Sequence, residues 1–339
     1  MRVVTFGEVM LRLATPGHER FSQAKVLEMT FGGAEANVAV ALATLGDEAS
    51  FVTRLPSNDI AEACVQELRG FGVDTRSILR GGDRIGVYYL EAGAAQRAST
   101  VTYDRAGSAL ATIDPAELDW SSLFEGREWF HFTGITPAVS DAAAQATRDA
   151  LQAAKKLGLT VSCDLNYRKK LWSPAKAQAV MSELMPMVDY CVANEEDADN
   201  VFGIKAEGAA VEQGRIDRDR YIQVASELSR RFSLKGAAIT LRESFSASRN
   251  GWSGLYFEAG RAYSSRRYEI EIVDRVGAGD SFAAGLIHAL GRRMSPQDAV
   301  EFAAATSCLK HTIPGDFYRV SRREIETLLA GDASGRVQR

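Results

Sequence analysis

The residues best suited to chemistry form a short run near the C-terminal end of the chain. Asp274-Arg-Val-Gly-Ala-Gly-Asp280 leads into an apolar segment with helical spacing that reaches Leu290. Small residues at the start of a helix leave backbone N–H groups accessible, and the helix dipole adds about half a positive charge there. We expect such an anion hole to be formed by Gly277, Ala278 and Gly279. It would suit a phosphoryl group in transfer, with Asp280 accepting a hydrogen bond from the hydroxyl group that attacks.

Asp280 is expected to be ionised, because the positive end of the helix dipole favours the charged form of a carboxyl group. The sequence therefore predicts a low pKa for Asp280, which makes it a weak base. Phosphoryl transfer tolerates a weak base, since its loose transition state depends mainly on alignment and charge stabilisation. Spacing alone leaves a second interpretation open, in which Asp280 only caps a helix with a tight glycine entry.

A mostly parallel sheet is predicted to position this helix. Short apolar runs rich in β-branched and aromatic residues recur at 3–6, 50–53, 129–132, 160–164, 190–193 and 237–241. Continuous apolar runs are typical of strands covered on both faces. Helical patterns lie between them, and their ends carry recognisable signals: Gly46 after residues 34–45, Ser173-Pro174, Ser295-Pro296, and Ser321 with Glu324. This alternation predicts an α/β fold with helices on both faces of the sheet.

Two segments break the alternation. Residues 10–31 mix charges with alternating apolar positions, and residues 84–109 read as two strands, 86–91 and 99–105, joined by a turn of small residues. We expect a small antiparallel sheet over one edge of the main domain, either a lid or an ordinary edge hairpin. The predicted division is a core of residues 1–12, 33–83 and 110–330, a β lid of 13–32 and 84–109, and a disordered tail of 331–339. Residues 203–218 read as a solvated loop.

Composition excludes several classes of protein. The 339 residues carry a formal net charge of -4, which disfavours a nucleic-acid partner. No window is apolar enough to span a bilayer, and the N-terminal residues lack the pattern of a secretory signal, so we expect no membrane partner and a cytoplasmic location. The four histidines show no metal-ligand spacing, and we expect buried free thiols at Cys64, Cys163, Cys191 and Cys308.

The 274–280 run resembles the C-terminal signature of the ribokinase-like (phosphofructokinase B) family of sugar kinases, D-T-x-G-A-G-D, with Arg275 in place of the threonine. The resemblance implies a three-layer α/β/α fold with a mostly parallel central sheet and a small β-sheet lid. It implies that Asp280 is the catalytic base and that the amides of residues 277–279 form the anion hole. ATP and Mg²⁺ would be required, and activation by a monovalent cation is left open.

Two further motifs extend the resemblance over nearly the whole chain. Phe31-Gly-Gly-Ala-Glu-Ala-Asn37 is similar to the family's N-terminal signature, in which Gly33 permits close approach to a ligand and Asn37 offers a donor and an acceptor to sugar hydroxyls. Asn194-Glu-Glu-Asp197 occupies the place of the N-x-x-E motif that organises magnesium and phosphate, with an aspartate one methylene shorter than the usual glutamate. The alternative for Asn194 and Asp197 is an acidic helix N-terminus.

Within the family, the sequence is most similar to the 2-keto-3-deoxygluconate kinases. The residues that carry this likeness are the runs 7–13, 103–109, 134–137, 164–168 with 171–172, and 315–316. The implied substrate contacts are Gly33, Asn37, Tyr88, Tyr103, Arg105, Ile135, Arg168 and Asp316. Strand alternation sends Tyr88 and Tyr89 to opposite faces, which leaves the choice between them open.

A physical argument supports a sugar acid as the substrate. Arginine meets a carboxylate with paired, charge-assisted hydrogen bonds, and both Arg105 and Arg168 stand at suitable places in the sequence. The alternative for Arg168 is a solvated basic loop. Family position suggests that the ATP contacts are Thr240, Arg242 and Ser307.

The expected reaction is ATP-dependent phosphorylation of the terminal C6 hydroxyl of 2-keto-3-deoxygluconate or a close keto-deoxy sugar acid, by a homodimer or higher homo-oligomer. Alternatives are a fructokinase or ribokinase acting on a neutral sugar, and an inactive sugar- or nucleotide-binding regulator. A nicotinamide dehydrogenase is disfavoured, because no G-x-G-x-x-G run opens a helix after the first strand.

Overall fold

A computed structural model describes residues 1–205 and 218–331. Its main sheet follows the order β13-β12-β11-β10-β9-β8-β1-β4-β5, and β14 also pairs with β12. Its strands are β1 (Arg2–Phe6), β4 (Glu48–Leu55), β5 (Ile78–Arg80), β8 (Trp129–Thr133), β9 (Thr160–Asp164), β10 (Tyr190–Asn194), β11 (Gly236–Ser244), β12 (Arg249–Glu258), β13 (Arg261–Ser264) and β14 (Tyr268–Glu271). Pairing is parallel from β5 to β11 and antiparallel beyond β11.

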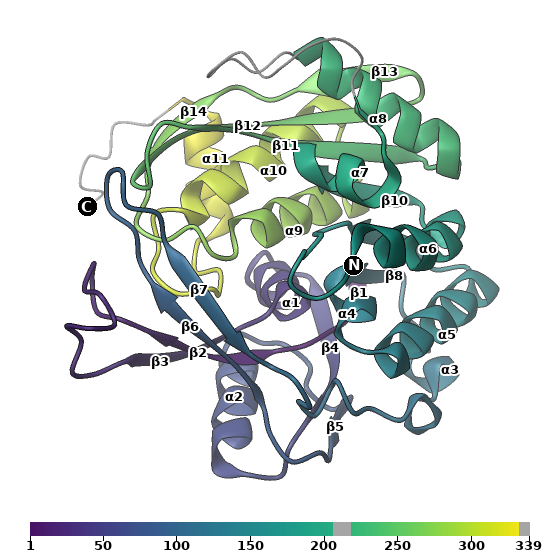
Figure 1. Cartoon of the computed structure of the whole chain (residues 1–339). Helices are drawn as coiled ribbons and strands as arrows, with labels where there is room; N and C mark the ends of the chain where they lie inside the picture. The colour runs from purple at the N-terminus through teal and green to yellow at the C-terminus, as the bar shows by residue number, and fades with distance from the viewer. Residues whose placement is uncertain (206–217, 332–339) are drawn as a thin grey trace.

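Helices cover both faces of this sheet (Figure 1). One apolar core lies under α1 (Ala34–Thr44), α2 (Asp59–Gly70), α9 (Ala278–Gly291), α10 (Pro296–Lys310) and α11 (Arg322–Leu329). The other lies under α3 (Trp120–Leu123), α5 (Asp141–Leu157), α6 (Pro174–Leu184), α7 (Glu195–Phe202) and α8 (Arg218–Phe232). Neighbouring residues of β1 divide between the cores, Val3 in the first and Val4 in the second, as strand alternation requires. The predicted three-layer α/β/α fold is confirmed.

The local signals in the sequence correspond to the elements observed. Each of the six apolar runs lies within one strand of the main sheet. The caps at Ser173, Ser295 and Ser321 each accept a hydrogen bond from the third residue of their helix. Shorter helical elements are α4 (Ile135–Val139) and the 3-10 turns at Pro115–Glu117 and Met185–Met187. All four cysteines are buried and free, as predicted.

A second, smaller sheet has the strand order β3-β2-β6-β7 and extends from one side of the molecule (Figure 1). Its strands are β2 (Met10–Ala14), β3 (Glu28–Gly32), β6 (Gly86–Glu91) and β7 (Thr100–Asp104). The prediction of an antiparallel sheet was wrong for its central pair, because β2 and β6 run parallel. The two hairpins β2–β3 and β6–β7 are antiparallel. The strands that pair between the hairpins, β2 and β6, come from separate parts of the chain and run in the same direction.

The boundaries proposed for the lid stay a prediction, and β2 crosses the expected border between residues 12 and 13. Most of the predicted solvated loop, residues 206–217, and the predicted disordered tail from residue 332 lie outside the described residues. None of the helices within residues 1–205 and 218–331 combines the length and the apolar character needed to cross a membrane.

Candidate active site

A cavity of about 360 Å³ is lined by residues of both sheets and by the start of α9. Asp164 and Asn194, the last residues of β9 and β10, bring the carboxyl ends of the parallel strands to it. This is where ligands bind in open α/β sheets. The predicted site residues that line the cavity are Gly33, Asn37, Tyr88, Tyr103, Arg105, Ile135, Arg168, Asn194, Asp197, Thr240, Arg242, Gly277, Ala278, Gly279, Asp280 and Asp316.

The glycine turn before α9 leaves amide groups without strong hydrogen bonds to described residues, in residues that line this cavity. Gly277 is the N-cap of α9 with a φ of 81°, a left-handed conformation that favours glycine. A Cβ atom at Gly277 would also stand 2.4 Å from the carbonyl oxygen of Asp316. Within the described residues the amides of Gly277 and Gly279 have no hydrogen-bond partner, and the Ala278 amide makes only a 3.4 Å contact with the Arg275 carbonyl. These amides can therefore donate hydrogen bonds to a bound anion.

Asp280 is buried, with 9% of its surface exposed, and Asn37 Nδ2 donates a 2.7 Å hydrogen bond to its Oδ2. Burial raises the pKa of Asp280 to about 6, and the negative charge of Asp316 acts in the same direction. The Asn37 bond and the positive charges of Arg168 and Lys310 lower that pKa without offsetting the burial. The predicted low pKa was wrong, because the loss of solvation on burial raises the pKa of this carboxyl group.

Asn37 is held from both sides. Its Oδ1 accepts a 3.3 Å hydrogen bond from the amide of Gly33, while its Nδ2 donates to Asp280. Gly33 is packed so closely on the first loop that a Cβ atom there would stand 1.9 Å from the Glu8 carbonyl oxygen. The N-terminal glycine pair thus fixes the backbone that carries Asn37, and Asn37 in turn orients the carboxylate of Asp280.

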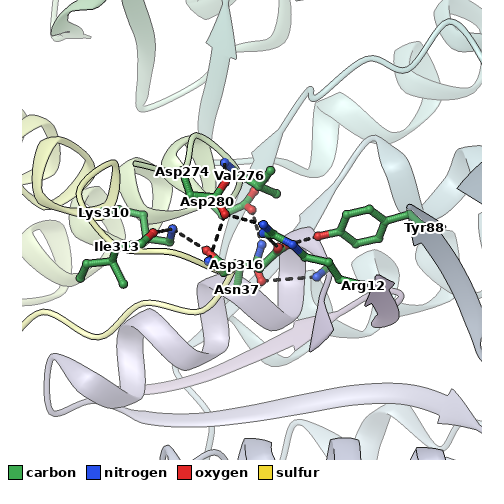
Figure 2. Close-up of polar contacts among 11 residues, drawn as sticks. Arg12, Asn37, Tyr88, Asp274, Val276, Asp280, Lys310, Ile313 and Asp316 are labelled. Carbon is green, nitrogen blue, oxygen red and sulfur yellow. Dashed lines mark hydrogen bonds and ion pairs between the residues drawn. The ribbon is translucent and has the colours of Figure 1, made fainter. Parts of the chain in front are cut away.

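Asp316 belongs to a buried polar cluster that joins the second sheet to loops beside α9 and α10 (Figure 2). Its Oδ1 accepts hydrogen bonds from Tyr88 Oη at 2.5 Å and from Arg12 Nη1 at 2.7 Å. Arg12 Nη2 also pairs with Asp274 Oδ2 at 2.5 Å. Of the two tyrosines that the sequence left open, Tyr88 is the one that lines the cavity. Arg12 lies in the run 7–13 that carries the family likeness, but no role was predicted for it, because an arginine in an apolar strand has no motif that indicates one.

The two arginines predicted to meet a sugar carboxylate differ in their surroundings. Arg105 is buried and forms an ion pair with Glu8, and its guanidinium lies 5.8 Å from the centre of the Tyr103 ring. Arg168 is exposed and forms no ion pair with any residue that the structure describes; its Nη1 donates a 3.4 Å hydrogen bond to the Tyr167 carbonyl. Arg168 is therefore the cation of this pair that is available to an incoming anion.

The other part of the cavity surface carries a second pair of arginines. The Arg242 side chain is exposed, with no hydrogen bond or ion pair to a described residue, and Arg275 Nη2 donates to the Ala247 carbonyl at 2.8 Å. Burial and the positive charge of Arg242 lower the pKa of Arg275. Ser307 does not reach the cavity: it is fully buried, and its hydroxyl donates to the Ala278 carbonyl at 2.7 Å. Direct contact of Ser307 with a nucleotide is therefore not supported.

Asn194 and Asp197 form a capping box at the start of α7. Asn194 Oδ1 accepts from the Asp197 amide at 2.9 Å, and Asp197 Oδ2 accepts from the Asn194 amide at 3.2 Å. Asp197 Oδ1 also accepts from the Tyr167 amide at 3.0 Å. The capping arrangement that the sequence offered as an alternative is thus present. No group of three or more His, Cys, Asp or Glu side chains in the described ranges could hold a metal ion by itself.

Besides Glu8, two buried acids at the cavity were not singled out in the sequence. Glu35 Oε1 accepts hydrogen bonds from the amide and the hydroxyl of Thr133 and from the hydroxyl of Thr136, and burial raises the pKa of Glu35 to about 7. Burial, with the charges of Asp197 and Asp280, raises the pKa of Asp164 well above its ordinary value. Their positions within the N-terminal signature and at a strand end were the signals that could have identified them.

Comparison with known proteins identifies the family of this chain. The model of the family described as "pfkB family carbohydrate kinase" matches residues 1–317. A 2-dehydro-3-deoxygalactonokinase of Haloferax volcanii is 35% identical over 333 residues, covering 98% of both chains. A 2-dehydro-3-deoxygluconokinase of Bacillus subtilis is 30% identical, covering 95% of this chain and 93% of its own. The crystal structure of 2-dehydro-3-deoxygluconokinase from Thermotoga maritima is 51% identical, with a TM-score of 0.94 and 98% coverage of each chain.

Proposed function

Because this chain belongs to the pfkB family of carbohydrate kinases, we propose that it transfers the γ-phosphoryl group of ATP to the terminal C6 hydroxyl of 2-keto-3-deoxygluconate or a close keto-deoxy sugar acid. The products are the 6-phosphate and ADP. One observation carries the proposal: a single cavity holds unpaired amides beside a buried carboxylate, and an arginine that forms no ion pair with a described residue. The relatives named for keto-deoxy sugar acids support this class of substrate.

In the proposed reaction, the ionised Asp280 accepts a hydrogen bond from the sugar hydroxyl and takes its proton as the oxygen attacks the γ-phosphorus. The bond from phosphorus to the β–γ bridging oxygen breaks, and ADP leaves. The amides of residues 277–279 stabilise the charge on the phosphoryl oxygens. A pKa of about 6 suits this role, because the carboxylate is mostly ionised at neutral pH yet is a stronger base than an ordinary aspartate.

The sugar-acid assignment depends on charge. Arg105 is neutralised by Glu8, so its guanidinium is already paired, whereas Arg168 keeps its charge available. We therefore assign the sugar carboxylate to Arg168, and hydroxyl recognition to Tyr88, Tyr103 and Asp316. A neutral hexose would leave Arg168 without an anion, which disfavours the fructokinase and ribokinase alternatives.

For the nucleotide, we propose that Thr240 and Arg242 contact ATP. Mg²⁺ commonly binds proteins through one or two carboxylates, with phosphates and waters completing its shell, so the absence of a three-ligand cluster in the described residues fits a metal held largely by the nucleotide. Asn194 and Asp197 are the residues that would support it. When bound, Mg²⁺ would offset the negative charge of the phosphates.

Two broader predictions belong to this proposal. The first is a cytoplasmic location. The second is a homodimer or larger homo-oligomer formed through the second sheet. Apolar side chains exposed at its β3 edge support the assembly: Val26, Leu27 and Met29. Light scattering during gel filtration measures the oligomeric state, and Met29→Glu should favour the monomer.

The test is a coupled ADP-release assay with the gluconate and galactonate forms of the keto-deoxy sugar acid, and with fructose and ribose for comparison. We expect the highest kcat/KM with a sugar acid, and the site of phosphorylation is read by phosphorus NMR. Turnover of only the neutral sugars would overturn the substrate assignment. ATP binding without turnover of any of these sugars would favour the inactive-regulator alternative.

A further inference from the structure

Arg12 is a buried cation of the second sheet that does not line the cavity. It lies on β2, with 5% of its surface exposed, and its guanidinium stands between two carboxylates of the main body. Nη2 meets Asp274 Oδ2 at 2.5 Å and Nη1 meets Asp316 Oδ1 at 2.7 Å (Figure 2). A buried charge that is bonded in this way tolerates little displacement, because both partners would lose a desolvated ion pair.

Each of these carboxylates has a second set of partners that reaches the site. Asp316 Oδ1 also accepts from Tyr88 Oη at 2.5 Å, and both residues line the cavity. Asp274 accepts from the Val276 amide at 3.0 Å through Oδ1 and from the Gly315 amide at 3.0 Å through Oδ2. Asp274 therefore holds the turn that leads into the anion hole, while Asp316 holds the hydroxyl group of Tyr88, which is a predicted sugar contact.

The loop that carries Asp316 also packs against the anion hole itself. The backbone of Asp316 packs against Gly277, where a Cβ atom would stand 2.4 Å from the Asp316 carbonyl oxygen. Lys310 Nζ donates to the carbonyls of Ile313 at 3.2 Å and Gly315 at 2.7 Å, and these bonds hold the loop that carries Asp316. A shift of Asp316 would therefore move the surface on which Gly277 rests.

Charge balance makes Arg12 important for Asp280. The positive charges of Arg12 and Lys310 match the negative charges of Asp274 and Asp316, so these four buried groups are neutral together. The charged groups that act on Asp280 are Asp316, Arg168, Lys310 and the buried carboxyl group of Asp164, and Asn37 donates a hydrogen bond to it. Without Arg12, an uncompensated negative charge would remain next to Asp280.

We propose that Arg12 is a positioning residue for phosphoryl transfer. By holding Asp274 and Asp316 together, it aligns the anion hole with the predicted sugar contacts of the second sheet. The positioning role of Arg12 goes beyond the proposed kinase function. It rests on that function only for the roles of Asp280 and Asp316. It predicts that Arg12 affects catalysis without touching substrate.

The test compares Arg12→Met and Arg12→Lys with Arg127→Met as a matched control. Arg127 pairs with Asp74 at 3.2 Å, is partly buried, and lies outside the cavity. The sugar used is the one that the unaltered protein phosphorylates best. Inactivity with sugar acids would then refute the proposed substrate without affecting this test. Thermal unfolding, kcat, both KM values and the pH dependence of kcat are measured for each variant.

We expect Arg12→Met to lower kcat/KM for the sugar by about 100-fold, since a displacement of about 1 Å can cost that much. The acidic limb of its kcat profile should move to higher pH, because the unbalanced charge disfavours ionised Asp280. Arg12→Lys keeps the charge but cannot bond both carboxylates in the geometry of a guanidinium. We expect it to lower kcat/KM for the sugar by about tenfold and to leave the acidic limb of the kcat profile close to its original pH. Arg127→Met should lose stability only.

The proposal fails if Arg12→Met unfolds more easily than the unaltered protein yet retains its kcat, its sugar KM and its acidic limb. Such a result would make Arg12 a structural residue only. If Arg12→Met does not fold, Arg12→Lys decides: a folded variant with unchanged kinetics and an unchanged pH profile overturns the positioning role, and a loss in kcat/KM supports it.

Discussion

Replacing Asn37 by leucine should move the pH dependence of catalysis by an amount that the structure allows us to work out. The 2.7 Å bond from Asn37 Nδ2 to Asp280 Oδ2 is buried and ends on a charged group. Hydrogen bonds to charged groups contribute about 1.5–3 kcal/mol, and 1.36 kcal/mol corresponds to about one pKa unit. Leucine removes the donor without opening space for water. We therefore expect the pKa of Asp280 to rise from about 6 to about 7–8.

At pH 7, the ionised fraction of Asp280 should fall from about nine-tenths to between about one-half and one-tenth. The assay is kcat at saturating sugar and ATP from pH 5 to pH 9. The variant should lose about two- to tenfold at pH 7 and recover toward pH 9, because activity requires the ionised carboxylate and fails as pH falls through its pKa.

A buried neighbour with a similar pKa provides the control. Glu35 has a pKa of about 7 and accepts a 2.6 Å hydrogen bond from Thr136 Oγ1. Thr136→Val should raise the pKa of Glu35 and leave the acidic limb of kcat in place. The assignment of Asp280 as the base would be refuted if Asn37→Leu left the limb unmoved, or if Thr136→Val moved it instead.

Three further substitutions test separate parts of the site. Asp280→Asn should lower kcat by about 10²–10⁴-fold with ATP binding retained. Because burial raises the folded-state pKa of Asp280 from 3.8 to about 6, ionisation of this group costs stability progressively as pH rises from about 4 to about 6. The same variant should therefore be up to about 3 kcal/mol more stable at pH 7, and this gain should vanish as pH falls toward 4. Arg168→Ala should raise the KM for the sugar acid by about 10–100-fold, the worth of charge-assisted hydrogen bonds. Arg275→Thr should raise the KM for ATP by about tenfold with little effect on sugar KM, because a half-buried guanidinium beside Arg242 is placed to meet phosphate charge.

Each of these outcomes has a clear opposite. Near-normal turnover of Asp280→Asn would remove the base from the mechanism, and a stability difference that persisted at pH 4 would contradict the burial argument. An unchanged sugar KM in Arg168→Ala would count against the carboxylate contact, for which Lys169→Ala on the same exposed loop is the control. A change in sugar KM rather than ATP KM in Arg275→Thr would reassign that arginine.

Much of the fold could be predicted because its signals are local. The serine caps, Gly46, and the six apolar runs act through neighbouring residues, and the structure reproduces them. The second sheet was harder, since the parallel pairing of β2 with β6 joins strands from separate parts of the chain. Backbone pairing at that distance leaves no trace in either strand's own pattern.

The sequence by itself determined the chemistry available to this protein: a glycine turn before a helix, a carboxylate in its first turn, an amide in the N-terminal signature, and basic side chains near strand ends. These features depend on residue type and short spacing. Only the tertiary structure decided how they are used. It buried Asp280 and so raised its pKa, paired Arg105 with Glu8, and turned Ser307 away from the cavity. Solvation and charge pairing depend on every group that packs around an atom, and those groups come from parts of the chain that meet only when it folds.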